Sequence, residues 1–145
     1  MTEPINFVET RFQSLSPFSA HSIMIWGEVF PTVEHAYQAS KLKPSIERER
    51  IKNASSPFDA WRQGQKYKKY PELKVENFDK EKVMEELFRA KIAQHPDIVE
   101  ILKESGDREL RKNYDSDYFW GTGKDVSGEN RMGKLWMKLR AEIFG

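Results

Sequence analysis

The sequence predicts a mainly helical α+β fold in a single domain, residues 1–145, with a few short strands. Its length and its 38% content of hydrophobic residues suffice for one core and leave no room for a second. Short apolar segments separated by turn signals fill the first third of the chain, which favours strands there. Apolar residues at helical spacing, with capping signals before them, fill most of the remainder and favour helices.

The first third contains a candidate hairpin and the start of the first helix. Extended segments are expected at residues 5–8 and 22–26, and a turn at Gly27 and Glu28 would lead to a short returning strand. Thr32 is the expected N-cap of a helix over residues 33–43, which Pro44 would end.

Later helices are indicated by the same kinds of signal. Ser56 followed by Pro57 is typical of a cap and a first helical position, and Asp79 is a second expected cap. The expected helices cover residues 45–54, 57–67, 80–95, 96–105 and 130–145, the last with the clearest amphipathic pattern. Short strands are expected at residues 110–113 and 118–120, and Trp61 and Trp136 are expected in the core.

Composition excludes several classes of protein. Lys and Arg number 24 against 23 Asp and Glu, so the net charge of +1 argues against a generic nucleic-acid or membrane binder. The absence of Cys excludes disulfides, thiolate metal sites and Cys nucleophiles. No targeting segment and no run near the roughly 20 apolar residues of a spanning helix is present, so a cytoplasmic protein without a membrane partner is expected.

The helix expected at residues 33–43 carries an acid, an amide and an amine on one arc. Glu34, Gln38 and Lys41 fall together at about 100° per residue, beside Tyr37 on the expected core face. Such a group can supply a proton donor or acceptor, an orienting hydrogen bond and a cation. From the pattern alone, a solvated polar face is the favoured interpretation.

A second candidate is the loop at residues 118–133, where three aromatic residues precede a glycine-rich stretch. The loop leads into the last helix, whose first backbone N–H groups favour phosphate, and Lys124 and Arg131 can add positive charge. The alternative is a surface loop capped by Asn130, and the pattern leaves both interpretations open. The loop is not a Walker loop, because no Gly-Lys-Ser/Thr follows at the required spacing.

Other chemistries have weaker support. The three histidines show no metal-ligand spacing, so no metal is expected. Ser14, Ser16 and Ser19 lack a recognisable His and Asp arrangement, which argues against a serine hydrolase. Glu34 facing another carboxylate across a cleft stays possible. The run at residues 66–70 is interpreted as a solvated helix end, with a weak phosphate or single-strand nucleic-acid contact as the alternative.

Taken together, the two candidate regions resemble the NADAR family, also called YbiA-like. The residues that carry the resemblance are Glu34-His35, Gln38, Lys41, Trp120-Gly121, Asn130-Arg131 and Gly133. Additional matches are Leu15-Ser16-Pro17-Phe18, Ala54-Ser55-Ser56-Pro57, Gly64 and Arg89-Ala90-Lys91. The match covers nearly the whole chain in order, and the combination of motifs is more specific than any one of them.

The resemblance implies a compact, mainly helical α+β domain with N-glycosidase activity and no cofactor. Family members cleave the ribosylamine bond of early riboflavin-pathway intermediates, and relatives remove ADP-ribose from guanine bases. The implied ligand is therefore a small ribosyl phosphate or an ADP-ribose-type molecule, with ADP-ribosylated nucleic acid and a non-catalytic ADP-ribose-binding module as alternatives. Carried over, Glu34 and Lys41 are the expected catalytic pair, and the expected binding residues are Tyr37, Gln38, Trp120, Gly121, Lys124, Asn130 and Arg131.

Two positions depart from the family pattern. Pro17 stands where members commonly have Asn, so a side-chain contact expected there must be absent or replaced. Glu129 stands where some members have Lys, which makes the expected anion site less positive and shifts phosphate recognition to Lys124 or Arg131.

Overall fold

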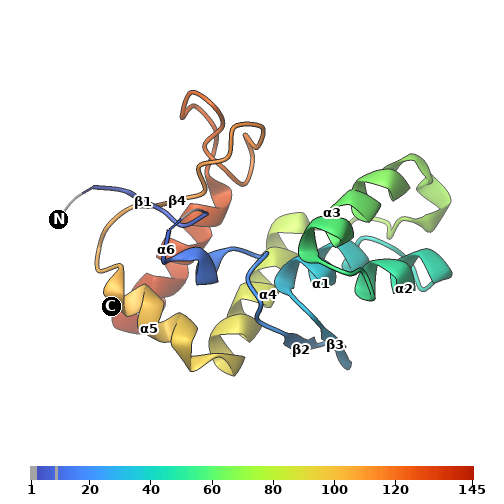
Figure 1. The fold of residues 1–145 in the computed structure, drawn as a ribbon, viewed down its shortest axis with the longest axis horizontal. Helices are drawn as coiled ribbons and strands as arrows, with labels where there is room; N and C mark the ends of the chain where they lie inside the picture. Colours follow the sequence, from blue (N-terminus) through green and yellow to red (C-terminus); the bar gives the residue numbers. More distant parts are fainter. Residues whose placement is uncertain (1–2, 9) are drawn as a thin grey trace. The chain divides into compact units, whose positions relative to one another are not determined.

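The computed structural model describes residues 3–8 and 10–145, and within these residues it has six α-helices, three short 3-10 helices and four short strands (Figure 1). The mainly helical α+β fold expected from the sequence is confirmed. Two compact units can be distinguished, and each is described by itself. The central unit is Pro17–Gln94, and the terminal unit combines the described residues before Pro17 with His95–Gly145.

The central unit begins with the expected hairpin. Strands β2 (Ile23–Ile25) and β3 (Glu28–Phe30) pair antiparallel, with Ile23 opposite Phe30. The turn lies at Trp26 and Gly27, both with positive φ, one residue earlier than the sequence predicts. Such a two-residue turn matches the right-handed twist of the strands.

Helix α1 (Val33–Ser40) follows, and its N-cap is the predicted Thr32, whose hydroxyl accepts a hydrogen bond from the backbone N–H of His35. The helix ends three residues before the predicted boundary. The segment after it pairs with a later segment instead: Lys43 N–H donates to Leu73 O, and Val75 N–H donates to Lys41 O. This non-local pairing has no signal in the local sequence.

Three further helices complete the central unit. Helices α2 (Ile46–Lys52) and α3 (Pro57–Lys66) are capped by Ser45 and Ser56. The 3-10 helices η2 (Tyr67–Lys69) and η3 (Pro71–Leu73) then lead to α4 (Lys80–Gln94). Helices α2, α3 and α4 all contact α1, and α4 also contacts β2. Helix α1 is therefore enclosed by the rest of its unit.

The terminal unit joins the beginning and the end of the described chain. Strands β1 (Ile5–Asn6) and β4 (Leu110–Arg111) pair in parallel, and η1 (Gln13–Leu15) contacts α5 (Pro96–Glu104). Helix α6 (Arg131–Phe144) packs on β4 and α5. Trp136 is fully buried there, as predicted, and its indole N–H donates to Leu15 O over 2.8 Å.

Two local predictions are wrong. Residues 118–120 form a turn instead of a strand, because the Asp117 carboxylate accepts hydrogen bonds from the backbone N–H groups of Phe119 and Trp120. Trp61 is 41% exposed and stacks on Phe58 on the surface of α3, so it is not a core residue. No helix within the described residues is long and apolar enough to cross a membrane.

Candidate functional site

The polar residues of α1 are buried. Glu34 is only 6% exposed and Gln38 only 2%, and every residue from Val33 to Ala39 is buried. The solvated face favoured by the sequence pattern is therefore wrong. Because burial of a carboxylate and an amide costs free energy unless both are well paired, their retention inside the unit indicates a specific role.

The backbone around Glu34 is held by its neighbours. Glu34 N–H donates to Pro17 O over 3.1 Å, so the backbone carbonyl of Pro17 contacts α1 where family members commonly carry Asn. The His35 ring also fixes this end of the helix: Nδ1 lies 2.8 Å from the Thr32 hydroxyl and Nε2 lies 3.0 Å from Ala54 O. Burial lowers the pKa of His35. His35 therefore orders α1 through both ring nitrogens.

Gln38 links Glu34 to α3. Its amide Nε2 donates a 2.7 Å hydrogen bond to Glu34 Oε2, one helical turn earlier. Its Oε1 is buried without a hydrogen-bond partner in the described part of the chain, and it lies directly against Gly64. A Cβ atom at residue 64 would stand 2.1 Å from this oxygen, so the close approach of α1 and α3 requires glycine.

Lys41 follows α1 directly, and its side chain is largely shielded from water. Its Nζ lies 4.7 Å from the centre of the Tyr37 ring, in cation–π contact. Burial lowers the pKa of Lys41 from 10.5 to about 8, while the charge of Glu34 raises it and the charges of three other lysines lower it further. A Lys41 amine with this pKa is partly neutral near physiological pH, and a neutral amine is a nucleophile.

The three lysines that act on Lys41 are Lys68, Lys80 and Lys74. They come from η2, the first position of α4 and the segment paired with residues 41–43. The sequence singled out Lys68 only as part of the basic run at residues 66–70 and gave no sign of Lys74 or Lys80, because the relation of all three to Lys41 depends on tertiary packing.

A buried lysine that sequence reasoning also missed lies on α4. Lys91 is fully buried, and its Nζ donates a 2.7 Å hydrogen bond to the Ser19 hydroxyl, which in turn shares a 2.8 Å hydrogen bond with His21 Nδ1. Lys91 follows the buried pair Leu87 and Phe88 at helical spacing, a signal that it faces the core. Ser19 itself is buried, so this cluster ties the segment after Pro17 to α4.

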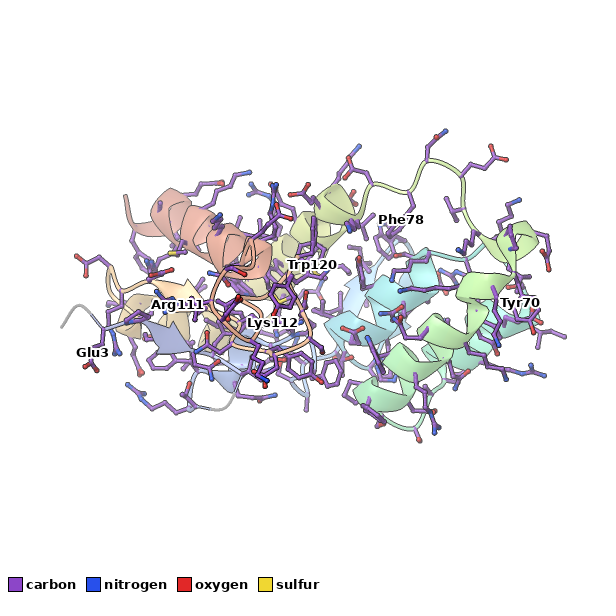
Figure 2. All side chains as sticks on the ribbon, turned by 90° about the horizontal axis from the view of Figure 1, so that it is seen from above. Glu3, Tyr70, Phe78, Arg111, Lys112 and Trp120 are labelled. Carbon is purple, nitrogen blue, oxygen red and sulfur yellow. The ribbon has the colours of Figure 1, made fainter. Side chains whose placement is uncertain are left out.

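The terminal unit holds the other sequence-predicted residues in the loop before α6. Trp120 is half-buried, and its ring meets Phe119 edge to face at 4.8 Å (Figure 2). Gly121 is buried, and a Cβ there would approach Lys112 O to 2.7 Å. Lys112 Nζ donates to the Asp117 carboxylate over 2.6 Å. Burial opposes ionisation of Asp117, but Lys112 outweighs it and lowers the Asp117 pKa.

The start of α6 differs from the expected anion site. The backbone N–H groups of Arg131 and Met132 donate to the carbonyl oxygens of Phe119 and Trp120, so they are not available to a phosphate. Asn130 adopts a left-handed conformation with φ of 49°, and its side chain does not cap the helix.

Asn130 instead joins α6 to β4. Its Oδ1 accepts a hydrogen bond from Lys112 N–H and its Nδ2 donates to Leu110 O, both over 3.0 Å. The Arg131 guanidinium donates to Glu129 Oε1 over 2.8 Å and lies over the Phe119 ring. Lys124 is exposed on the loop. Glu129 therefore already neutralises part of the positive charge expected here.

The kind of domain follows from the similarity of the chain to a known protein family. Residues 6–144 match the NADAR domain. The chain belongs to the NADAR family. This NADAR protein is 36% identical to N-glycosidase YbiA of Escherichia coli strain K12 over 141 residues, which cover 96% of this chain and 88% of YbiA.

Two further comparisons agree with the NADAR assignment. The NMR structure of E. coli YbiA superimposes with a TM-score of 0.83 at 33% identity, covering 99% of this chain and 86% of that one. The maize chloroplastic riboflavin biosynthesis protein PYRR is 35% identical over 160 residues, which include 99% of this chain but only 26% of PYRR.

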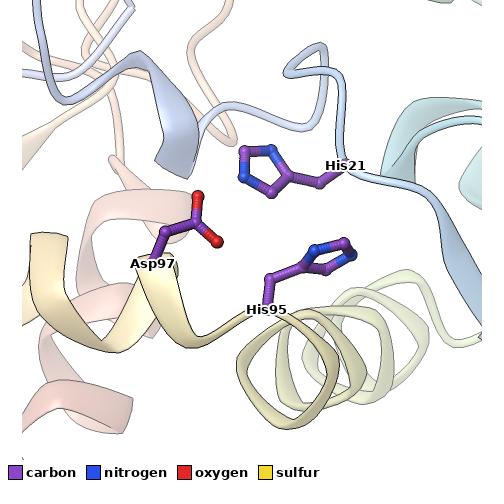
Figure 3. A group of neighbouring side chains, drawn as sticks. All are labelled: His21, His95 and Asp97. Carbon is purple, nitrogen blue, oxygen red and sulfur yellow. The ribbon is translucent and has the colours of Figure 1, made fainter.

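In this NADAR chain the structure brings together Glu34, Tyr37, Gln38 and Lys41 within the central unit. The other expected residues, Trp120, Gly121, Lys124, Asn130 and Arg131, belong to the terminal unit. His95 and Asp97 flank Pro96 at the start of α5 (Figure 3). The prediction that no metal is bound rests on the sequence alone and stays a prediction.

Proposed function

We propose that this protein is an N-glycosidase that hydrolyses the C1–N bond between a phosphate-bearing ribose and a nitrogenous base. The observation that carries the proposal is the buried group on α1, in which Gln38 is hydrogen-bonded to Glu34 and Lys41 has a lowered pKa. The names of the relatives support the reaction class, because YbiA is an N-glycosidase and PYRR is a riboflavin biosynthesis protein.

Glu34 meets the main electrostatic need of this reaction. Breaking the C1–N bond develops positive charge on the sugar and negative charge on the leaving nitrogen. A carboxylate at Glu34 stabilises the positive charge at C1 and accepts a proton from the attacking water, whose oxygen becomes the C1 hydroxyl of the released ribose phosphate. The leaving base takes up the proton that Glu34 accepted, which restores the Glu34 carboxylate. Gln38 holds the Glu34 carboxylate in one orientation for this step.

Lys41 supports a second route to the same products. Its neutral amine attacks C1 as the ribose ring opens, the base leaves with a proton, and a Schiff base forms between Lys41 and the sugar. Water then adds to the C=N bond and releases the ribose phosphate and the free amine. The lowered pKa of Lys41 favours this route, although the charge of Glu34 acts in the opposite direction.

The remaining site residues are assigned to substrate binding. Tyr37 lies against Lys41, and Trp120 offers a half-buried aromatic face suited to stacking on a base or sugar. On the basis of the family resemblance, substrate binding is also assigned to Gly121, Lys124, Asn130 and Arg131. The reaction needs no cofactor, and we place it in the cytoplasm as part of the same proposal.

The proposed substrate is a ribosylaminopyrimidine phosphate of the early riboflavin pathway. Removal of ADP-ribose from guanine in DNA or RNA is the second candidate. It is favoured by the exposed lysines of residues 66–69 and by Tyr70, which is exposed at the end of this basic segment. Tyr67 is buried, so it offers no stacking face to a nucleic acid.

One assay separates these functions. The purified protein is incubated with a ribosylaminopyrimidine phosphate and, separately, with ADP-ribosylated guanine DNA, and released base or ADP-ribose is quantified by chromatography. Release of ribose 5-phosphate from the first substrate supports the proposal, and release of ADP-ribose from the second supports the alternative. Binding of ADP-ribose without release from either substrate indicates a non-catalytic module and contradicts the proposal.

Borohydride trapping distinguishes the two routes. Reduction during turnover converts a Schiff base into a stable secondary amine, which mass spectrometry locates on the chain. An adduct on Lys41 that disappears in Lys41→Arg supports the covalent route. An active enzyme that forms no adduct uses Glu34 and water alone.

A further inference from the structure

We propose that Lys68, Lys74 and Lys80 bind the phosphate group of the substrate beside Lys41. This inference rests on the proposed function and moves phosphate recognition to the central unit, away from the glycine-rich loop. The three residues are called the lysine cluster below.

The chain path places the lysine cluster around the end of α1. Leu42 and Lys74 form an antiparallel bridge, flanked by the hydrogen bonds from Lys43 N–H to Leu73 O and from Val75 N–H to Lys41 O. Main-chain hydrogen bonds therefore hold the backbone of Lys74 opposite Leu42, the residue after Lys41.

The other two lysines reach the same place from helices that pack on α1. Lys80 is the first residue of α4, and Phe78, two residues earlier, meets the Tyr37 ring at 6.0 Å (Figure 2). Lys68 lies in η2, which follows directly from α3. Three separate segments thus carry positive charge next to α1 or to a helix that contacts α1.

The lysine cluster is accessible to a ligand. Lys68 and Lys80 are exposed and Lys74 is half-buried. Within the described residues, neither the Lys68 nor the Lys74 ammonium group has a hydrogen bond or an ion pair. Both can therefore donate to an anion without first breaking a contact, and each ammonium group offers three donors.

The electrostatics are consistent with a site for an anion. Burial is the main cause that lowers the pKa of Lys41, and the charges of the lysine cluster lower it further, in agreement with the placement of these segments next to α1. Like charges gathered in this way repel one another, and a doubly charged phosphate relieves the repulsion. The start of α6, by contrast, has two of its N–H groups occupied and Arg131 paired with Glu129.

Lys41 and the lysine cluster have different roles in the proposed site. Lys41 is half-buried, contacts the Tyr37 ring and belongs, with Glu34, to the chemical part of the proposed site. The lysine cluster lies further out and contacts the phosphate at the opposite end of the ribose from C1. A substrate without phosphate would therefore lose affinity and keep its reactive bond unchanged.

The test measures binding of ribose 5-phosphate and of unphosphorylated ribose by calorimetry. Substitutions Lys68→Gln, Lys74→Gln and Lys80→Gln are each expected to weaken ribose 5-phosphate binding about three- to tenfold, with a much larger loss in the triple variant. Binding of ribose should stay unchanged. Lys82→Gln is the matched control, since Lys82 is exposed on the same helix as Lys80, and it should bind as the wild type does.

Two outcomes overturn the proposal: a triple variant that binds ribose 5-phosphate as tightly as the wild type, or a wild type that binds ribose equally well. ADP-ribose in a parallel titration shows whether a monophosphate or a diphosphate is preferred. Because binding is measured without turnover, loss of phosphate binding in a protein that cleaves no substrate would support the lysine cluster and refute the proposed function.

Discussion

Gln38 Nε2 and Glu34 Oε2 are joined by a 2.7 Å hydrogen bond inside the central unit, one turn apart on α1. The two residues are close in sequence, but the segments that hold them are distant. Gly64 of α3 covers Gln38, and the backbone N–H of Glu34 donates to the carbonyl oxygen of Pro17. Two distant segments therefore fix the position of the carboxylate before any substrate binds, which is what preorganised catalysis requires.

Replacement of Glu34 by Gln is expected to abolish turnover. Gln at this position keeps the size of the side chain and can still accept the bond from Gln38, but it cannot carry negative charge or take up a proton. A loss of about 10²–10⁴-fold in kcat is expected, with product affinity changed only slightly. Glu100→Gln, on an exposed position of α5, is the control. An active Glu34→Gln enzyme would refute the assignment.

Gly64→Ala is expected to disturb the site through Gln38. The added methyl would lie 2.1 Å from Gln38 Oε1, so the amide must move and its bond to Glu34 must lengthen or break. We expect a loss of about 1–3 kcal/mol in stability and a lower kcat. A double-mutant cycle gives the control: in a Gln38→Ala background the clash is gone, and Gly64→Ala should then stabilise α3 by about 0.5–1 kcal/mol. If Gly64→Ala destabilised the wild type and the Gln38→Ala variant equally, a clash with Gln38 would not be the cause.

Local signals predicted the elements of the fold well. Thr32 and Ser56 are the caps that their residue types and spacing indicate, because capping depends only on the first turn of each helix. The family motif points to Glu34 and Lys41, whose catalytic role stays a prediction. Helical periodicity alone favoured a solvated face for them.

The environment of the site could not be predicted in the same way. Burial of Gln38 depends on a glycine 26 residues later, and the pKa of Lys41 depends on lysines from three other segments. These are tertiary relationships without a local pattern. A similar relationship affects the start of α6, where carbonyl groups of residues 119 and 120 accept hydrogen bonds from the N–H groups of Arg131 and Met132, which the sequence leaves open.

Trp120→Ala is expected to weaken ligand binding without unfolding the protein. The Trp120 ring is half-buried and meets the Phe119 ring edge to face at 4.8 Å, and its exposed part suits a stacking surface. A loss of about 1–3 kcal/mol in binding is expected by analogy with base–aromatic stacking. Trp136→Ala is the contrast, since it empties a fully buried site and should cost about 3–5 kcal/mol of stability. A large fall in the melting temperature of Trp120→Ala would instead assign that ring to packing.

Lys41→Met is expected to stabilise the protein at neutral pH while abolishing any Schiff-base chemistry. Burial disfavours the charged amine in the folded state, and its pKa there is about 8 against 10.5 ordinarily. Below pH 8 the Lys41 amine is charged in both the folded and the unfolded protein. The folded protein is therefore destabilised by burial of this charge, and Met at position 41 removes the destabilisation. Between pH 8 and 10.5 the unfolded chain binds more protons than the folded one, so the stability of the wild type rises with pH and the advantage of Met disappears.

Urea denaturation at pH 7 and at pH 10 measures the difference in unfolding free energy between Lys41→Met and the wild type. At pH 7 the gain from Lys41→Met is expected to be about 1–2 kcal/mol, after allowance for the partial exposure of the side chain. Lys43→Met, at an exposed position two residues away, should give no such gain. A Lys41→Met protein that is less stable than the wild type at pH 7 would show that the charge of Glu34 stabilises the ammonium group more than burial destabilises it. The covalent route would then lose its physical basis, since a lysine stabilised as a cation is a poor nucleophile.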